Sequence, residues 1–309
     1  MALHVIVGAG AVGTATARLL AERGEQVRLV SRRGTGPEHP AVERVAADAT
    51  DSATLTRIAG GATALYNCAA PPYHRWPLEW PPLAAALLDA AEATGAVLVS
   101  AGNLYLYGPV DGPLTEELPA RPAGPKARVR AGMWQDAIAR HEAGRIRTAD
   151  VRASDHLGGG SQSMITNLVL PRVLAGRRAS VPADLDAPHT WTDIAAVART
   201  LVAVADDERA WGRAWHVPSA QPLSIREVAA RACALADVAP PRLSTMPSPV
   251  LWLGGLTNPL ARELRETQYQ FRAPFVMDST AATAALGITP TPIDESLAET
   301  VRGVAPARY

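Results

Sequence analysis

Residues 3–13 read "LHVIVGAGAVG", and this stretch decides the fold. The continuous apolar run predicts a buried strand, and the residues over 11–24 have helical spacing. A glycine-rich turn between a strand and a helix is the setting in which a G-x-G-x-x-G motif binds a dinucleotide. Gly8 would permit the tight turn, Gly10 would let the backbone approach a pyrophosphate, and Gly13 would let helix pack on strand. The predicted cofactor-binding residues of this turn are Gly8, Gly10, Ala11, Val12 and Gly13. The alternative is an ordinary strand-to-helix turn that is rich in small residues.

Strand-like and helix-like stretches alternate through the first half of the chain. The predicted strands are 26–32, 42–48, 62–70, 96–102 and 147–154, and the predicted helices are 51–59, 80–94 and about 127–143. This order predicts an α/β fold, a doubly wound parallel Rossmann sheet with right-handed crossovers. After residue 155 the alternation stops, and 214–218 reads as an isolated strand. We therefore expect a dinucleotide-binding domain over 1–155 and a smaller, mainly substrate-binding region over 156–309, partly interleaved with it.

Composition narrows the class of partner. The 30 basic residues balance the 30 acidic ones, so no net field steers the protein to nucleic acid or to an anionic membrane. Cys68 and Cys233 are too far apart for a metal knuckle and read as buried core residues. No apolar run reaches the length of a membrane span. We expect a cytoplasmic protein, monomer or homodimer, that acts on a small molecule without a metal.

The end of the second predicted strand selects the dinucleotide. An NAD site usually places an acidic residue there, whereas this chain has Ser31, Arg32 and Arg33. Forked guanidinium donors suit a 2′-phosphate, so the sequence predicts NADP(H), unless both arginines are merely solvated. Asp48, after the third strand, would bind the adenine amino group or cap the helix that begins near Asp51.

Further motifs resemble the extended short-chain dehydrogenase/reductase superfamily, which includes the NAD-dependent epimerase/dehydratases. They are "GAGAVG" (8–13), "NCAAP" (67–71), "NLYLYGP" (103–109), "VRASDHLGGG" (151–160) and "HTWTDIAAVA" (189–198). The resemblance implies a Rossmann domain, with substrate bound by the C-terminal part. It also adds Ala69 to the predicted cofactor residues.

The usual catalytic residues of that superfamily are substituted. Asn103 stands at the usual Ser or Thr position, and Lys126 and Arg130 stand where the Tyr-x-x-x-Lys pair is expected. The usual proton transfer by tyrosine is therefore not carried over. In this respect the chain is similar to atypical members that tailor polyketides as ketoreductases without the tyrosine.

The substitutes still allow reduction of a carbonyl. The amide of Asn103 can polarise an oxygen, and the ammonium of Lys126, with an ordinary pKa of about 10.4, can donate a proton. Lys126 could instead bind ribose or phosphate oxygens of the cofactor, and Arg130 could hold the nicotinamide ribose. Tyr105 is a further catalytic candidate, because it would point away from Tyr107 if that stretch is extended.

Aromatic and apolar residues indicate the substrate. The predicted substrate-binding residues are Tyr73, Trp76, His156 and Trp252. Residues 247–271 read as two short amphipathic helices, which would cover the pocket as a lid or else pack as ordinary helices or a dimer face. The sequence thus favours NADPH-dependent reduction of a ketone on a bulky hydrophobic, polyketide-like substrate. An NADP(H)-binding sensor without turnover and a sugar-nucleotide-type epimerase or isomerase remain alternatives.

Overall fold

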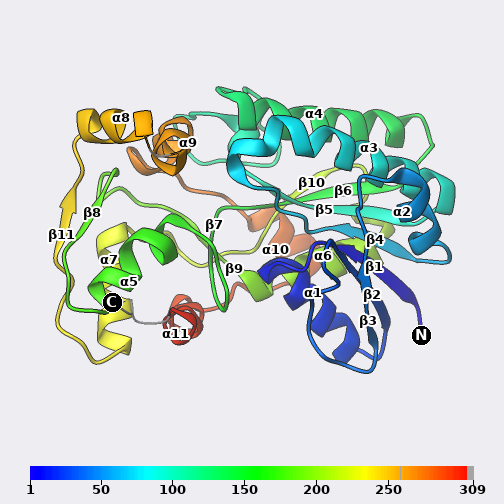
Figure 1. The fold of residues 1–309 in the computed structure, drawn as a ribbon, viewed down its shortest axis with the longest axis horizontal. Coiled ribbons are helices and arrows are strands. Elements are labelled where there is room, and N and C mark those ends of the chain that lie inside the picture. The colour runs from blue at the N-terminus through cyan, green and yellow to red at the C-terminus, as the bar shows by residue number, and fades with distance from the viewer. Residues whose placement is uncertain (258, 305–309) are drawn as a thin grey trace.

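A seven-stranded parallel sheet forms the centre of the computed structural model, which describes residues 1–257 and 259–304. The strand order is β10-β6-β5-β4-β1-β2-β3 (Figure 1). The strands are β1 (Leu3–Val7), β2 (Gln26–Ser31), β3 (Val42–Ala46), β4 (Ala64–Asn67), β5 (Val97–Asn103), β6 (Thr148–Ala153) and β10 (Ala214–His216). The doubly wound Rossmann fold is therefore confirmed. The expectation of an isolated strand at 214–218 is wrong, because β10 pairs with β6 and extends the sheet.

Helices cover both faces of this sheet. On one face lie α1 (Ala11–Glu22) and α6 (Ile194–Asp206), which pack on each other and share a core with the strands. The other face carries α2 (Ser52–Ala59), α3 (Trp76–Thr94) and α4 (Pro125–Glu142). Strands covered on both faces must be apolar throughout, which explains the continuous apolar runs in the sequence.

Helix α3 begins four residues before the predicted 80–94. Two prolines inside it, Pro81 and Pro82, oppose a helix on local grounds. Tertiary packing outweighs that cost, because Trp76 and Trp80 are 3% and 0% exposed in the core beneath α4. Burial of two such large rings is worth several kcal/mol (about 2–3 each).

The C-terminal half supplies a second core. Apart from α6 and β10, the elements that follow β6 in the chain are β7 (Asp155–Leu157), η3 (Ile165–Val169), α5 (Leu170–Val173), β8 (Ala179–Val181), β9 (Trp191–Asp193), η4 (Glu208–Ala210), α7 (Ile225–Leu235), β11 (Leu243–Thr245), α8 (Ser248–Thr257), α9 (Pro259–Thr267), η5 (Gln268–Phe271), α10 (Thr280–Leu286) and α11 (Ile293–Gly303). β7 pairs with β9 and β8 with β11. Ser224 and Glu227 form a capping box at the start of α7, as their spacing predicts.

Within residues 1–257 and 259–304, no helix is long and apolar enough to cross a membrane. The same residues contain no cluster of three or more His, Cys, Asp or Glu side chains that could hold a metal ion. Cys68 and Cys233 are buried and free, as expected of core residues.

Candidate functional site

The glycine turn between β1 and α1 brings backbone close to backbone. Gly8 has a φ of +109°, and a methyl group added there would lie 2.5 Å from the carbonyl oxygen of Cys68. A methyl group on Gly13 would lie 1.9 Å from the carbonyl oxygen of Gly8. Gly10 is the N-cap residue of α1 and has open space around it, without a side-chain cap. The free N–H groups at the start of α1, next to Ala11 and Val12, therefore fit a pyrophosphate.

The end of β2 lies beside the glycine turn at the same edge of the sheet, because β1 and β2 pair in parallel. The hydroxyl of Ser31 accepts a hydrogen bond from the backbone N–H of Thr35 at 2.9 Å, which closes the turn after the strand. Arg32 and Arg33 follow, and both side chains are exposed. The two exposed cations lie at the end of β2, where the sequence predicts contact with a 2′-phosphate.

Asp51, and not Asp48, caps helix α2. The carboxylate of Asp48 accepts hydrogen bonds from the N–H (3.0 Å) and hydroxyl (2.8 Å) of Thr50, which hold the pKa of Asp48 below its usual value. Asp51 is the residue that caps α2, by accepting from the N–H groups of Ala53 and Thr54. Asp48 is exposed beside the cap and remains a prediction for adenine.

Loops from other elements lie beside the glycine turn, at the point between β1 and β4 where the strand order reverses. Ala69 follows β4, and a methyl on Gly8 would lie 2.6 Å from its nitrogen. A methyl on Gly160, after β7, would lie 3.5 Å from the Cβ of Ala11. Such an edge is where ligands bind in open α/β sheets.

Lys126, in the first turn of α4, is held by two carboxylates from α9. Its ammonium contacts Glu263 and, at 2.8 Å, Glu266. Glu266 also accepts the backbone N–H of Lys126 at 2.7 Å. The lysine side chain is 4% exposed, against 18% and 20% for the two glutamates. An ammonium has three donors, so one remains for a ligand.

Arg130 lies one turn further along α4 and points toward α3. Its guanidinium carbon is 4.9 Å from the ring centre of Trp76 and 4.4 Å from that of Trp80. Nη1 reaches the carbonyl oxygen of Ala101 at 3.4 Å, and burial lowers the pKa of Arg130. Trp76, which the sequence predicts to bind substrate, is almost fully buried and packs its ring against the guanidinium of Arg130.

Two tyrosines meet beside Asn103. Residues 105–107 form the 3-10 helix η2 rather than the extended stretch assumed from the sequence, because the turn at Gly108 follows at once. The hydroxyl of Tyr105 nevertheless contacts that of Tyr73, in η1 (Tyr73–Arg75), and the ring of Tyr73 lies 5.3 Å from the ammonium of Lys126. Burial of the hydroxyls raises the pKa of both tyrosines. The side-chain oxygen of Asn103 accepts the N–H of Tyr105 at 3.2 Å.

Tyr107 faces the interior instead. Its hydroxyl accepts from Arg152 at 2.6 Å and lies 2.8 Å from Nε2 of His216. Arg152 in turn donates to Asp150 at 2.8 Å. This buried chain of contacts ties β6 to β10 and gives Tyr107 a structural role.

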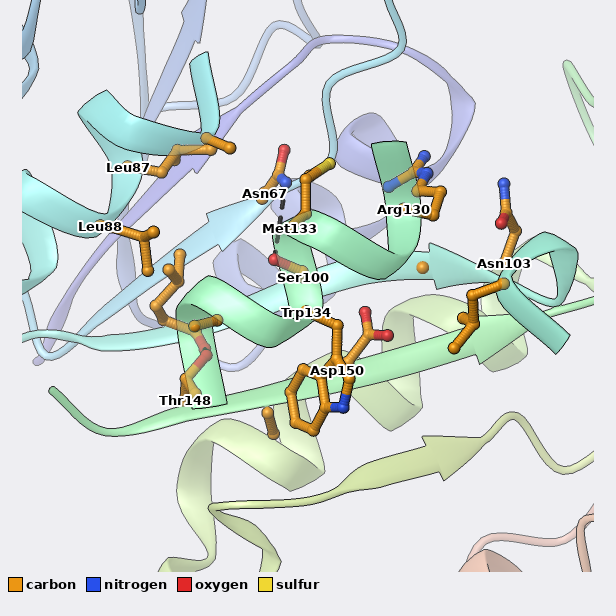
Figure 2. A pocket seen from close by; sticks show the side chains of 16 residues that line it. Asn67, Leu87, Leu88, Ser100, Asn103, Arg130, Met133, Trp134, Thr148 and Asp150 are labelled. Carbon is orange, nitrogen blue, oxygen red and sulfur yellow. Dashed lines mark hydrogen bonds between the residues drawn. The ribbon is translucent and has the colours of Figure 1, made fainter. Parts of the chain in front are cut away.

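A small cavity of about 30 Å³ lies between the sheet and helices α3 and α4. Arg130 and Asn103 lie at one end of it, and Leu87 and Leu88 lie at the other (Figure 2). Polar groups between them include Asp150. The volume suits about one water molecule, not a substrate.

His156 and Trp252 lie apart from this cluster. His156 is on β7, at the carboxyl edge, and burial lowers its pKa. Trp252 is 57% exposed on α8, and the guanidinium carbon of Arg265 lies 5.4 Å from the centre of its ring. Both therefore stay predictions for substrate binding.

Three residues near Lys126 were not foreseen from the sequence. Glu263 and Glu266 are 137 and 140 residues away from it in the chain. Tyr269 follows in η5, and its buried hydroxyl has no hydrogen-bond partner among the described residues. The one available signal was the i, i+3 spacing of the glutamates, which places them on one face of a helix.

Comparison with known proteins bears on the family and the fold. The model of the NAD dependent epimerase/dehydratase family matches residues 4–217. No curated protein sequence matched the chain.

Several solved structures share the fold. The Bordetella bronchiseptica enzyme WbmH in complex with NAD+ has a TM-score of 0.78 at 19% identity, covering 98% of each chain. UDP-glucose 4-epimerase from Thermotoga maritima with UDP-glucose has a TM-score of 0.79 at 15% identity, covering 97% of this chain and 98% of its own. DesIV, a dTDP-glucose 4,6-dehydratase from Streptomyces venezuelae, has a TM-score of 0.76 at 21% identity, covering 98% and 96%. At these identities the likeness establishes the fold.

Proposed function

This chain belongs to the NAD dependent epimerase/dehydratase family, and from that premise we propose that it is an NADPH-dependent reductase of a ketone on a bulky hydrophobic, polyketide-like substrate. The observation that carries the proposal is the buried ammonium of Lys126, which stands where the superfamily's tyrosine is expected and keeps one free donor. A reduction needs electrophilic help and a proton, and an ammonium can provide both.

The glycine turn fits a dinucleotide, because nothing lies within 4 Å of a methyl added at Gly10 and no side chain caps the N–H groups at the start of α1. Gly10, Ala11 and Val12 would hold the pyrophosphate, and Arg32 and Arg33 a 2′-phosphate. The nicotinamide, when bound, supplies a hydride to the carbonyl carbon. The family's name and the NAD in two of the similar structures point to NAD instead, so the arginines alone support NADP(H).

The protein's own part in the step is electrostatic. Asn103 and Lys126 would donate hydrogen bonds to the carbonyl oxygen as it gains negative charge. The proton then comes from Lys126, from water or from the substrate. Tyr73, Tyr105 and Tyr269 provide an aromatic wall for a planar substrate, and their raised pKa values keep them protonated near neutrality.

A redox-neutral epimerase or dehydratase of sugar nucleotides is the second candidate. The carboxylates of Glu263 and Glu266 favour it, because such a reaction begins when a base removes a hydroxyl proton. Similar structures also contain UDP-sugars. Both carboxylates already bind the ammonium of Lys126, however, so neither is free to take a proton from a substrate.

Transfer of label separates these candidates. The protein is incubated with NADPH deuterated at C4 of the nicotinamide and a panel of aromatic polyketide ketones, and products are analysed by mass spectrometry. Deuterium in a product supports the reductase. Conversion of a UDP- or dTDP-sugar without net consumption of NADPH would support the second candidate and contradict the first. Tight NADPH binding with neither reaction would instead favour a sensor without turnover.

A further inference from the structure

The contact between α4 and α9 is built around a single residue. Lys126 is the one lysine of the sequence, and both glutamates that face it lie on one turn of α9. Glu266 binds this lysine twice, through the backbone N–H and through the ammonium. Two anchors on one residue fix both the position of the backbone and the rotamer of the side chain.

Gly124 makes this approach possible. Its backbone is extended, with a φ of −155°, so conformational freedom is not the reason for a glycine here. A methyl group at this position would lie 2.4 Å from Oε1 and 2.7 Å from Cγ of Glu266. The missing side chain therefore leaves the space that the carboxylate of Glu266 occupies.

Among the side chains of α8 that the structure describes, most of the large apolar ones are exposed. Helices α8 and α9 pack on each other at one edge of the molecule (Figure 1), and α9 also contacts η1. Leu251 of α8 is buried (4% exposed), whereas Val250, Trp252, Leu253 and Leu256 are 52–60% exposed. Removing one partner of a buried ion pair leaves an unpaired charge and is strongly destabilising, so we expect loss of the glutamates to loosen the contact between α4 and α9.

We propose that Glu263 and Glu266 are positioning residues that fix the ammonium of Lys126 in the candidate site and, by the same contact, hold α9 closed over it. The glutamates occupy two donors of the ammonium and leave the third for a carbonyl oxygen. This inference rests on the proposed function for what Lys126 does, and on the contacts alone for how it is held.

The single lysine makes the contact directly measurable. The purified full chain is treated with an acetylating reagent at constant pH, and acetylation of Lys126 is followed by mass spectrometry against the same protein unfolded in urea. In the wild type we expect labelling at least about tenfold slower than in urea, because the amine is buried and paired. The E263A/E266A variant should label about tenfold faster than the folded wild type.

Two further variants separate positioning from general loosening. E266Q keeps an acceptor oxygen for the backbone N–H and should label at an intermediate rate, between the wild type and E263A/E266A. G124A retains every charge but displaces the carboxylate of Glu266, and should also speed labelling. D294N, which removes an exposed carboxylate 3.1 Å from Arg231, is the matched control and should leave the rate unchanged.

Circular dichroism checks that each variant is folded, and G124A decides the matter if the glutamate variants are not. Wild-type labelling as fast as in urea would overturn the proposal, as would rates within twofold of wild type in both E263A/E266A and G124A. None of these measurements needs cofactor or substrate. Positioning can therefore be confirmed even if deuterium transfer fails, and the two failures are distinguishable.

Discussion

The two ends of the candidate crevice are built in opposite ways. At the cofactor end, residues 8–13 form a turn from backbone alone, and glycine is required because carbonyl groups lie where side chains would be. At the reaction end, a lysine on α4 meets carboxylates 137 and 140 residues away. A site made of local backbone can be recognised in a sequence, whereas a site made of distant side chains can change its residues while the fold persists.

The largest effect that tests this contrast is expected at Gly13. The Gly13→Ala variant places a methyl 1.9 Å from the carbonyl oxygen of Gly8, and neither backbone can move without separating α1 from β1. We expect a loss of about 3 kcal/mol or more in the free energy of unfolding, measured by urea denaturation. Gly10→Ala is the control, since nothing lies within 4 Å of its added methyl, and should cost no more than about 1 kcal/mol while weakening NADPH binding. Equal stability of the two variants would contradict the structure of the turn.

At the reaction end, Lys126→Met should cost about 2 kcal/mol. The substitution leaves Glu263 and Glu266 facing each other without a cation, although their 18–20% exposure lets water offset part of the repulsion. Urea denaturation gives the change in stability, and proteolysis within 248–267 should become faster as α9 detaches. Arg231→Met, which breaks an exposed pair with Asp294, should change stability by less than about 0.5 kcal/mol. An undiminished stability of Lys126→Met would mean that the ion pair contributes nothing to closure.

The features that the sequence predicts correctly depend on residues close together in the chain. The apolar runs at β1 and β4 predicted buried parallel strands, and the spacing of Ser224 and Glu227 predicted the start of α7. The expectation for residues 214–218 was wrong, because a short strand carries no sign of which neighbour it pairs with.

At the candidate site, the sequence singled out Asn103, Tyr105 and Lys126 but neither of the glutamates that bind Lys126. A glutamate on an amphipathic helix looks the same whether it faces solvent or an ammonium. Tyr105 was expected to turn away from Tyr107 in an extended stretch, and it does so within a 3-10 turn instead. Which side chains meet across such distances depends on tertiary packing, which no local pattern specifies.

Acid should weaken the buried contacts between β6 and β10. His216 lies under Tyr107, with Nδ1 2.7 Å from the carbonyl oxygen of Asp278, and burial holds its pKa below the ordinary value of 6.5. The folded protein therefore keeps His216 neutral while the unfolded chain takes up a proton below about pH 6.5. Stability should fall as pH decreases from there, by up to about 1.4 kcal/mol per pH unit for this one group.

Urea denaturation between pH 7.5 and 5.5 measures that slope. His216→Gln should make it shallower, since glutamine can still accept from Tyr107 and does not titrate. His39, which is exposed, is the control, and His39→Gln should leave the slope unchanged. The same slope in wild type and His216→Gln would assign the acid sensitivity to other groups.

The smallest effect is expected at the β2 end of the cofactor crevice, where the contrast is least sharp because side chains rather than backbone would make the contact. Arg32 and Arg33 are exposed, so each contributes a screened interaction with a phosphate rather than a buried one. We expect Arg32→Ala and Arg33→Ala each to weaken NADPH binding about fivefold and to leave NADH binding unchanged, as measured by quenching of tryptophan fluorescence. Added salt should reduce the wild-type preference for NADPH, because exposed charges are screened. Arg57→Ala, on the exposed side of α2, should alter neither affinity. If both arginine variants lose NADPH and NADH equally, the arginines do not read the 2′-phosphate, and the selectivity of the crevice must then come from its backbone, as its pyrophosphate site does.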